Sequence, residues 1–154
     1  MARILVQSDD PFAPDVLPLL DEHLSDMRAT SPPESVHALE PGGLVGPGLT
    51  FFTARQDGEL LGCGALKDLG TGEGEIKSMR TTAAARGKGV ASALLGRLID
   101  EAKVCGFTAL RLETGVEDYF APARAMYAKF GFEPCGPFAN YVDDPNSVYM
   151  VLTL

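Results

Sequence analysis

The chain has 154 residues, of which 45% are hydrophobic and 22% charged, and its formal net charge is −8. This length suits one domain with one sizeable core, and we expect residues 1–154 to form a single domain. The acidic charge argues against non-specific binding of nucleic acid. No apolar run reaches the roughly eighteen residues of a membrane span, and the N-terminus does not resemble a signal peptide. We therefore expect a cytoplasmic protein that binds neither nucleic acid nor membrane.

The first expected elements are a short strand and an amphipathic helix. Residues 3–7 form an apolar run that two aspartates and a proline end, as is typical of a strand. From residue 14 to 27, apolar side chains recur at steps of three and four, which predicts a helix of about four turns. His23 lies beside this stripe, and we expect it to be a partly buried or surface residue. Prolines in the segment 31–35 end the helix.

Three strands are expected next, joined as an antiparallel meander. Residues 49–56 and 59–69 are rich in residues that favour strands. Asp57-Gly58 between them is a strong hairpin signal. Residues 74–81 alternate in side-chain character, which predicts the third strand.

The second half of the chain alternates helices and strands. Apolar residues at helical spacing predict a helix over 90–102, and Gly106 lies in the preferred position just past a helix end. A strand at 108–114, a helix at 121–130 and a last strand at 147–154 follow. These elements predict an α/β (α+β) fold with a mixed central sheet of about six to seven strands. The sheet is expected to be antiparallel first and parallel later, with about four flanking helices.

Basic residues concentrate just before the helix at 90–102. Residues 77–103 carry 6 basic and 2 acidic side chains, whereas residues 1–76 carry 4 basic and 13 acidic ones. The segment RGKG, residues 86–89, lies in this basic region and leads directly into the helix. A bound anion would explain the pattern, and a chance cluster on a solubilising surface is the alternative.

The segment 86–89 has the features of a phosphate-binding turn. Backbone N–H groups in the first turn of a helix lack intrahelical partners and lie at the positive end of its dipole. Gly87 and Gly89 would leave these donors accessible, and Arg86 and Lys88 add positive charge. The spacing matches neither the P-loop nor G-x-G-x-x-G. On these residues alone, a phosphate site and a tight turn with solvated cations both remain open.

Two motifs make the chain similar to a known superfamily. The sequence RGKGVA at residues 86–91 fits R/Q-x-x-G-x-G/A, and ARAMYAKFGF at 123–132 resembles A-x-x-L-Y-x-K-x-G-F. Both are signatures of the GCN5-related N-acetyltransferase (GNAT) superfamily, and the order of elements resembles it too. The resemblance covers about residues 60–135 and points to a bacterial branch. Ala83 replaces the usual proline, and Phe120 stands where an asparagine is common.

The resemblance implies the identity of the anion. In this superfamily the pyrophosphate of acetyl-CoA lies on the glycine loop. Backbone groups two residues apart on the preceding strand bind the pantetheine arm, and the first of these N–H groups polarises the thioester carbonyl. The cofactor-binding residues implied for acetyl-CoA (CoA) are Met79, Thr81, Arg86, Gly87, Lys88, Gly89, Val90 and Ala91.

Acetyl transfer to an amine needs a group that accepts the proton of the amine. Glu75 stands eleven residues before Arg86, the spacing of the catalytic glutamate in histone-modifying members of the superfamily. Regular alternation would place Glu75, Lys77 and Met79 on one face of their strand, toward the cleft. We therefore expect Glu75 to be the base. An exposed, ion-paired glutamate is the alternative, and Glu113 on the next parallel strand is the competitor.

Tyr127 takes the position of the superfamily's tyrosine that donates a proton to the leaving thiolate, and a core aromatic is the alternative. Cys63, Cys105 and Cys135 have no metal-ligand spacing and no motif relation to a histidine. We expect reduced cysteines that lie mostly in the core, no metal, and no acyl-cysteine intermediate.

The expected acceptor is a primary amine of a small molecule that attacks directly in a ternary complex. In the superfamily, the first helix, the loop after it and the loop before the last strand shape the acceptor site. The candidate contacts are Glu34, His37, Glu113 and Tyr141, with Asp143 and Asp144 nearby. The alternatives are acetylation of a protein lysine or N-terminus, a non-catalytic acyl-CoA binder or sensor, and a different nucleotide binder. A homodimer is a further expectation from the fold.

Overall fold

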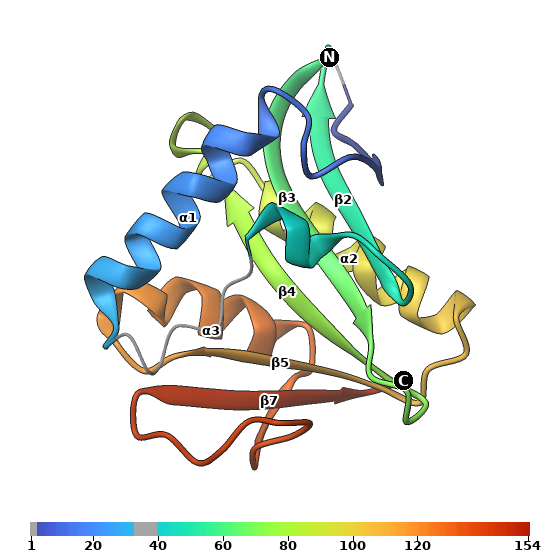
Figure 1. Cartoon of the computed structure of the whole chain (residues 1–154), viewed down its shortest axis with the longest axis vertical. Helices are drawn as coiled ribbons and strands as arrows, with labels where there is room; N and C mark the ends of the chain where they lie inside the picture. Colours follow the sequence, from blue (N-terminus) through green and yellow to red (C-terminus); the bar gives the residue numbers. More distant parts are fainter. Residues whose placement is uncertain (1–2, 33–39) are drawn as a thin grey trace.

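The computed structural model describes residues 3–32 and 40–154, and in this part of the chain one seven-stranded sheet carries three α-helices and three short 3₁₀ turns (Figure 1). The strand order is β1-β2-β3-β4-β5-β7-β6, with β4 and β5 parallel and every other neighbouring pair antiparallel. In chain order, the elements are β1 Leu5–Ser8, α1 Val16–Thr30, η2 Pro41–Leu44, β2 Leu49–Gln56, β3 Glu59–Asp68, β4 Glu73–Thr81, η3 Ala83–Ala85, α2 Val90–Val104, β5 Ala109–Gly115, η4 Asp118–Phe120, α3 Ala121–Lys129, β6 Glu133–Cys135 and β7 Ser147–Thr153. The predicted mixed sheet is confirmed.

Local turn chemistry explains several element boundaries. Asp57 and Gly58 have φ angles of 51° and 82°, so the β2–β3 hairpin turns where the sequence predicts it. α2 ends before Gly106, whose φ of 78° is the left-handed conformation of a helix C-terminus. Pro122 occupies the first turn of α3, where a missing backbone N–H costs no hydrogen bond.

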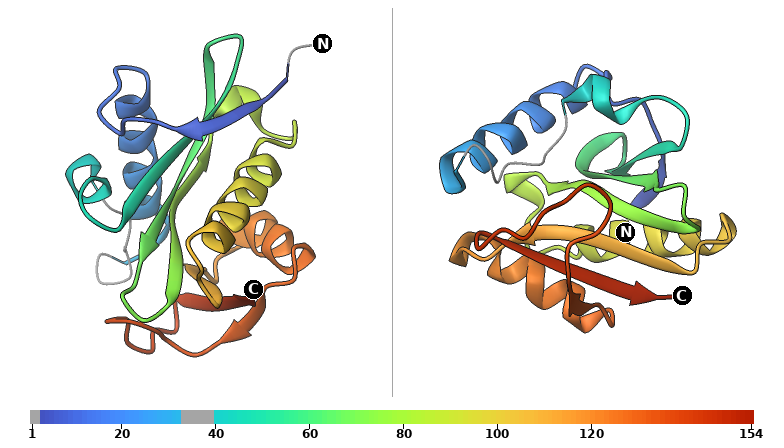
Figure 2. Two further views of the ribbon diagram at one scale, coloured as in Figure 1. Left: turned by 90° about the vertical axis from the view of Figure 1, so that its right-hand side faces the viewer. Right: turned by 60° about the horizontal axis from the view of Figure 1, so that its bottom comes forward.

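The sheet separates α1 from α2 and α3, as the left view of Figure 2 shows, and a hydrophobic layer lies on each face. α1 lies against one face, and α2 and α3 lie against the other. The α1 layer is built from Val16, Leu19, Leu20, Leu44, Phe51, Cys63 and Ala65. The larger layer under α2 and α3 includes Phe52, Ile76, Leu94, Leu95, Leu98, Leu110, Leu112 and Tyr127. β4 and β5 pair only over their first residues, and a gap opens between the two strands beyond that point.

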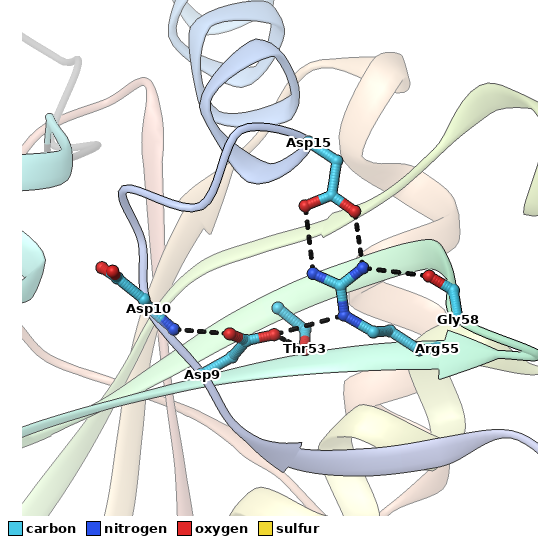
Figure 3. A network of polar contacts seen from close by, with 6 residues as sticks. All are labelled: Asp9, Asp10, Asp15, Thr53, Arg55 and Gly58. Atoms are coloured by element: carbon cyan, nitrogen blue, oxygen red, sulfur yellow. Dashed lines mark hydrogen bonds and ion pairs between the residues drawn. The ribbon is translucent and has the colours of Figure 1, made fainter.

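A polar network fastens the start of α1 to the sheet (Figure 3). The Arg55 guanidinium on β2 donates to both carboxylate oxygens of Asp15, at 2.5 and 3.0 Å. Its Nε donates to Asp9 at 3.2 Å, and Asp9 also accepts from the Thr53 hydroxyl at 2.7 Å. These bonds fix where α1 crosses the sheet, and α1 forms one wall of the site described below.

Of the three free cysteines, only Cys63 is buried, whereas Cys105 is exposed and Cys135 half-buried. The expectation that they lie mostly in the core is therefore wrong. Within residues 3–32 and 40–154, no helix combines the length and the hydropathy needed to cross a bilayer.

Candidate active site

β4 and β5 run parallel but pair over three residues only. The paired residues are Glu73 with Ala109, Gly74 with Leu110 and Glu75 with Arg111. Both strands continue well past this point, so they separate after Glu75. Main-chain groups on the facing edges of a separated pair must find another partner, since buried backbone N–H and C=O groups are almost always satisfied. The gap is therefore open to an extended ligand.

A β-bulge interrupts β4 within this gap. Ser78 has a φ of 55°, and the β3–β4 register shifts between Cys63, opposite Arg80, and Ala65, opposite Lys77. The extra residue reverses the alternation of side chains. Met79 consequently packs in the layer under α2. The prediction that Met79 shares a face with Glu75 and Lys77 is wrong, because it assumes a regular strand.

A cleft of about 660 Å³ fills the space between the two strands. This volume is typical of small-molecule sites. It is lined by β4 and β5, by the cleft-facing side of α1, by the first turn of α2, and by α3. Two α1 residues and the residue that caps its C-terminus recur in the lining at steps of four: His23, Met27 and Ser31.

The glycine loop before α2 presents open backbone to this cleft. Gly87 and Gly89 have φ angles of 77° and 81°, which L side chains rarely adopt. A Cβ atom added at either position would meet nothing within 4 Å, so the space in front of the loop is open. Gly89 is the N-cap of α2 and provides no side-chain cap for the N–H groups of Val90 and Ala91. These features fit a diphosphate.

Seven of the eight residues that the resemblance implies for the cofactor line the cleft: Met79, Thr81, Arg86, Gly87, Gly89, Val90 and Ala91. Lys88 is exposed and is not part of the lining. The Val90 side chain is buried in the core, so only its backbone is available to a ligand.

Glu75 lies at the point where the strands separate, and one of its carboxylate oxygens accepts two hydrogen bonds. Its Oε2 atom accepts from the Tyr141 hydroxyl at 2.6 Å and from the Lys77 ammonium at 3.1 Å. Lys77 also donates to the Tyr141 hydroxyl at 2.8 Å, which closes a triangle. Only 3% of the Glu75 side chain is exposed. The predicted pairing of Glu75 with Lys77 is present, but in a buried site.

Glu113 lies on β5, two residues beyond the last β4–β5 pair, and also lines the cleft. Burial raises the pKa of its carboxyl to about 7, and the charge of Glu75 adds to the increase. Tyr127 on α3 lines the same cleft and packs edge-on against Phe132, with ring centroids 5.7 Å apart. Burial, together with the Glu113 charge, raises the pKa of the Tyr127 hydroxyl, so it stays protonated.

The sequence model of the acetyltransferase (GNAT) family matches residues 16–132, more than two thirds of the chain. The matched span contains α1, both separated strands, the glycine loop and α3. The chain belongs to the GNAT family.

Related sequences and structures agree with this assignment. The chain is 50% identical over 149 residues to the uncharacterized N-acetyltransferase YsnE of Bacillus subtilis, covering 97% of this chain and 99% of that protein. It is 40% identical over 154 residues to the IAA acetyltransferase of Azospirillum brasilense, covering 97% of each chain. A Klebsiella pneumoniae structure, provisionally named an acyl-CoA N-acyltransferase, superposes with a TM-score of 0.79 at 28% identity, covering 98% of this chain and 97% of that one.

As a GNAT enzyme, the protein is an acyltransferase that uses acyl-CoA. The open backbone of the glycine loop, at the N-terminus of α2, suits the diphosphate of such a donor. The mixed sheet with its separated parallel pair agrees with the fold that the sequence resemblance implies.

Some of the residues expected to contact the acceptor in this GNAT enzyme line the cleft, and others do not. Glu113 and Tyr141 line the cleft. Asp143 is exposed and Asp144 half-buried, and neither belongs to the cleft lining. Two further candidates, Glu34 and His37, lie outside the described residues.

The structure adds cleft residues that the sequence reasoning missed. His23 is buried and lines the cleft, although its position beside an apolar stripe suggested no role. Burial, with the Arg80 charge nearby, lowers its pKa to about 4, so the imidazole is neutral at pH 7. Arg80 and Tyr119 also line the cleft and bond to each other from distant elements. Only the basic charge of residues 77–103 pointed toward Arg80.

Proposed function

We propose that this GNAT enzyme transfers an acetyl group from acetyl-CoA to a primary amine of a small molecule, by direct attack in a ternary complex. The observation that carries the proposal is that Glu113 and Tyr127 line the same cleft. One is a carboxyl whose pKa is raised to about 7, and the other is a hydroxyl that remains protonated. Acyl transfer to an amine needs this combination of a proton acceptor and a proton donor.

We assign the role of general base to Glu113 in preference to Glu75. A base works best when its pKa lies near the operating pH, and the pKa of Glu113 does so. The Glu75 oxygen that faces its neighbours already accepts two hydrogen bonds, from Lys77 and Tyr141. Glu75 then acts as a positioning residue that holds Tyr141, and with it the β6–β7 connection, at the cleft.

The remaining roles follow from position. Acetyl-CoA supplies the thioester whose carbonyl carbon the amine attacks. Glu113 accepts a proton from the bound ammonium, so that the neutral nitrogen can attack, and solvent takes the second nitrogen proton as the C–N bond forms. The Met79 N–H, beside the bulge, is assigned to stabilise the negative charge on the carbonyl oxygen. Tyr127 donates its proton to the sulfur as the C–S bond breaks, and solvent returns that proton to the hydroxyl.

The charges around the cleft favour a cationic amine. Lys77 balances Glu75, and Arg80 and Arg86 lie close to the two α1 carboxylates, whereas Glu113 forms no ion pair among the described residues and adds negative charge when ionised. A positively charged acceptor would be attracted to this region before it loses its proton. A cytoplasmic location and a homodimer stay predictions.

Release of the CoA thiol from acetyl-CoA tests the proposal. The acceptor panel should contain small primary amines, amino acids, peptides with free N-termini or lysines, and IAA, because one relative is an IAA acetyltransferase. We expect turnover with at least one small amine. Tight CoA binding without turnover on any acceptor would favour the acyl-CoA sensor instead. Turnover restricted to peptides would favour the protein-modifying alternative.

The residue roles have their own test. Glu113→Gln and Tyr127→Phe should each lower kcat by about a hundredfold or more and leave CoA affinity nearly unchanged. Glu75→Gln should lower kcat less than Glu113→Gln does. If Glu75→Gln abolished turnover while Glu113→Gln retained it, the two roles would have to be exchanged.

A further inference from the structure

Arg80 joins three elements at the open end of the gap. It lies at the end of β4, and its Nη1 donates to the Tyr119 hydroxyl of η4 at 2.8 Å. Its Nη2 donates to the carboxylates of Glu22 and Asp26 on α1. The Tyr119 hydroxyl in turn donates to Asp26 at 3.3 Å, which closes the group. We call these four side chains the Arg80 tie.

A second contact links α1 to the segment around η4. The Ser31 hydroxyl, at the C-terminus of α1, donates to the Glu117 carboxylate just before η4, at 3.3 Å. Arg124 of α3 then donates to the main-chain carbonyls of Gly115 and Glu117, at 2.6 and 3.0 Å. The β5–α3 connection is thus held by α3 on one side and by α1 on the other.

Stability alone is a poor explanation for the Arg80 tie. Only 5% of the Arg80 side chain is exposed, and its Nε–H has no partner among residues 3–32 and 40–154. Its partner carboxylates on Glu22 and Asp26 are 47% and 38% exposed, so solvent screens their attraction while the Arg80 charge is desolvated. An unpartnered buried donor adds a further cost. What the tie does provide is a fixed spacing between α1, β4 and η4.

We propose that Arg80 is a positioning residue, which acts through Tyr119 and α1 to set the width of the acceptor side of the cleft. α1 presents His23 and Met27 to the cleft from the sheet face that also carries Glu75 and Lys77. The hydrogen bonds of the tie involve α1, β4 and η4, whereas the glycine loop that suits the donor lies at the N-terminus of α2. Loosening α1 should therefore disturb the acceptor more than the donor. This inference rests on the proposed acetyl transfer to an amine.

Tyr119→Phe is the sharpest test, because it removes one hydroxyl from a side chain that is 43% exposed and leaves the ring in place. We expect the acceptor KM to rise about fivefold, the change that corresponds to loss of one typical hydrogen bond. The Kd for CoA and kcat should stay within about twofold. The KM for bulky amines should rise less than the KM for small ones. Glu101→Gln, which breaks the Arg97–Glu101 pair on α2 outside the cleft lining, is the matched control and should change none of these.

Amide hydrogen exchange gives a readout that needs no turnover. Tyr119→Phe should speed exchange in the last turn of α1 and in η4, but not in α2. If the wild type acetylates an amine while Tyr119→Phe matches it in acceptor KM and in exchange, the tie has no positioning role and the inference is wrong. If the wild type acetylates no amine, the proposed function fails, whereas unchanged exchange alone would still refute the tie.

Discussion

Replacing Glu113 by glutamine should make the protein less active but more stable at alkaline pH. Burial raises the folded-state pKa of this carboxyl from 4.5 to about 7. Below the unfolded pKa the group is protonated in both states, so burial carries no charge penalty. Above the folded pKa it is ionised in both states, and the folded state carries the full penalty. Glutamine, which is neutral and nearly isosteric, removes this pH-dependent term.

The size of the effect follows from the shift. One pKa unit corresponds to about 1.4 kcal/mol, so a rise from 4.5 to about 7 places the penalty on the order of 3 kcal/mol. Part of the side chain reaches solvent, so this value is an upper bound. The free energy of unfolding of Glu113→Gln should exceed that of the wild type by about 1–3 kcal/mol at about pH 8, and the gain should vanish near pH 4.

Urea unfolding at a series of pH values measures this directly, with Glu59→Gln, an exposed glutamate, as the control. The wild-type kcat/KM should also rise with pH and level off above about pH 7, as expected when the ionised carboxylate is the base. A Glu113→Gln variant that is destabilised at alkaline pH, or whose stability change is independent of pH, would refute the reasoning.

Two further predictions concern the walls of the cleft. A Cβ at Gly115 would lie 2.3 Å from the buried Phe120 ring, so Gly115→Ala should destabilise the fold by about 2 kcal/mol in urea unfolding; Gly96→Ala, on α2 in open space, should instead stabilise it by about 0.5–1 kcal/mol. Arg55→Met should cost about 1–2 kcal/mol at neutral pH. Because Arg55 lowers the pKa of Asp15, this cost should begin to shrink as pH falls below about 3.8 and should vanish only below the lowered pKa of the folded state, and a loss that does not shrink with falling pH would point to packing instead.

The elements of the fold could be predicted because local signals and periodicity agree. Asp57-Gly58 supplies two residues that tolerate positive φ between strand-forming runs, and Gly106 ends a clean helical stripe. The glycine loop was also predictable, since small residues, cations and a following helix coincide in one short segment.

The bulge could not be predicted in the same way. Ser78 sits in a segment that alternates as a regular strand does, and serine has no marked preference for a φ of 55°. Gly64, where the register shifts, leaves room for the Met79 side chain, since a Cβ there would lie 2.7 Å from the Met79 sulfur and 3.2 Å from Leu98. This tertiary contact between β3, β4 and α2 is not visible in any short stretch of sequence.

The long-range contacts between polar groups of the cleft were missed for a related reason. Glu75 and Tyr141 are 66 positions apart, and Arg80 is more than 50 positions from Glu22 and Asp26. No spacing rule connects such residues, because only the folded sheet brings them together. A motif could identify Tyr127, but the balance between Glu75 and Glu113 depends on burial and hydrogen bonding in three dimensions.

Calorimetric titration of CoA into the wild type and Ala91→Asp tests the central claim most directly. Ala91 is the second residue of α2, where a carboxylate favours the helix through its dipole but would repel a diphosphate. We predict that Ala91→Asp unfolds at a temperature no lower than the wild type and binds CoA at least about tenfold more weakly, whereas Ala91→Ser binds it nearly normally. Equal CoA affinity in the wild type and Ala91→Asp would contradict the account, because the donor could not then lie on the glycine loop.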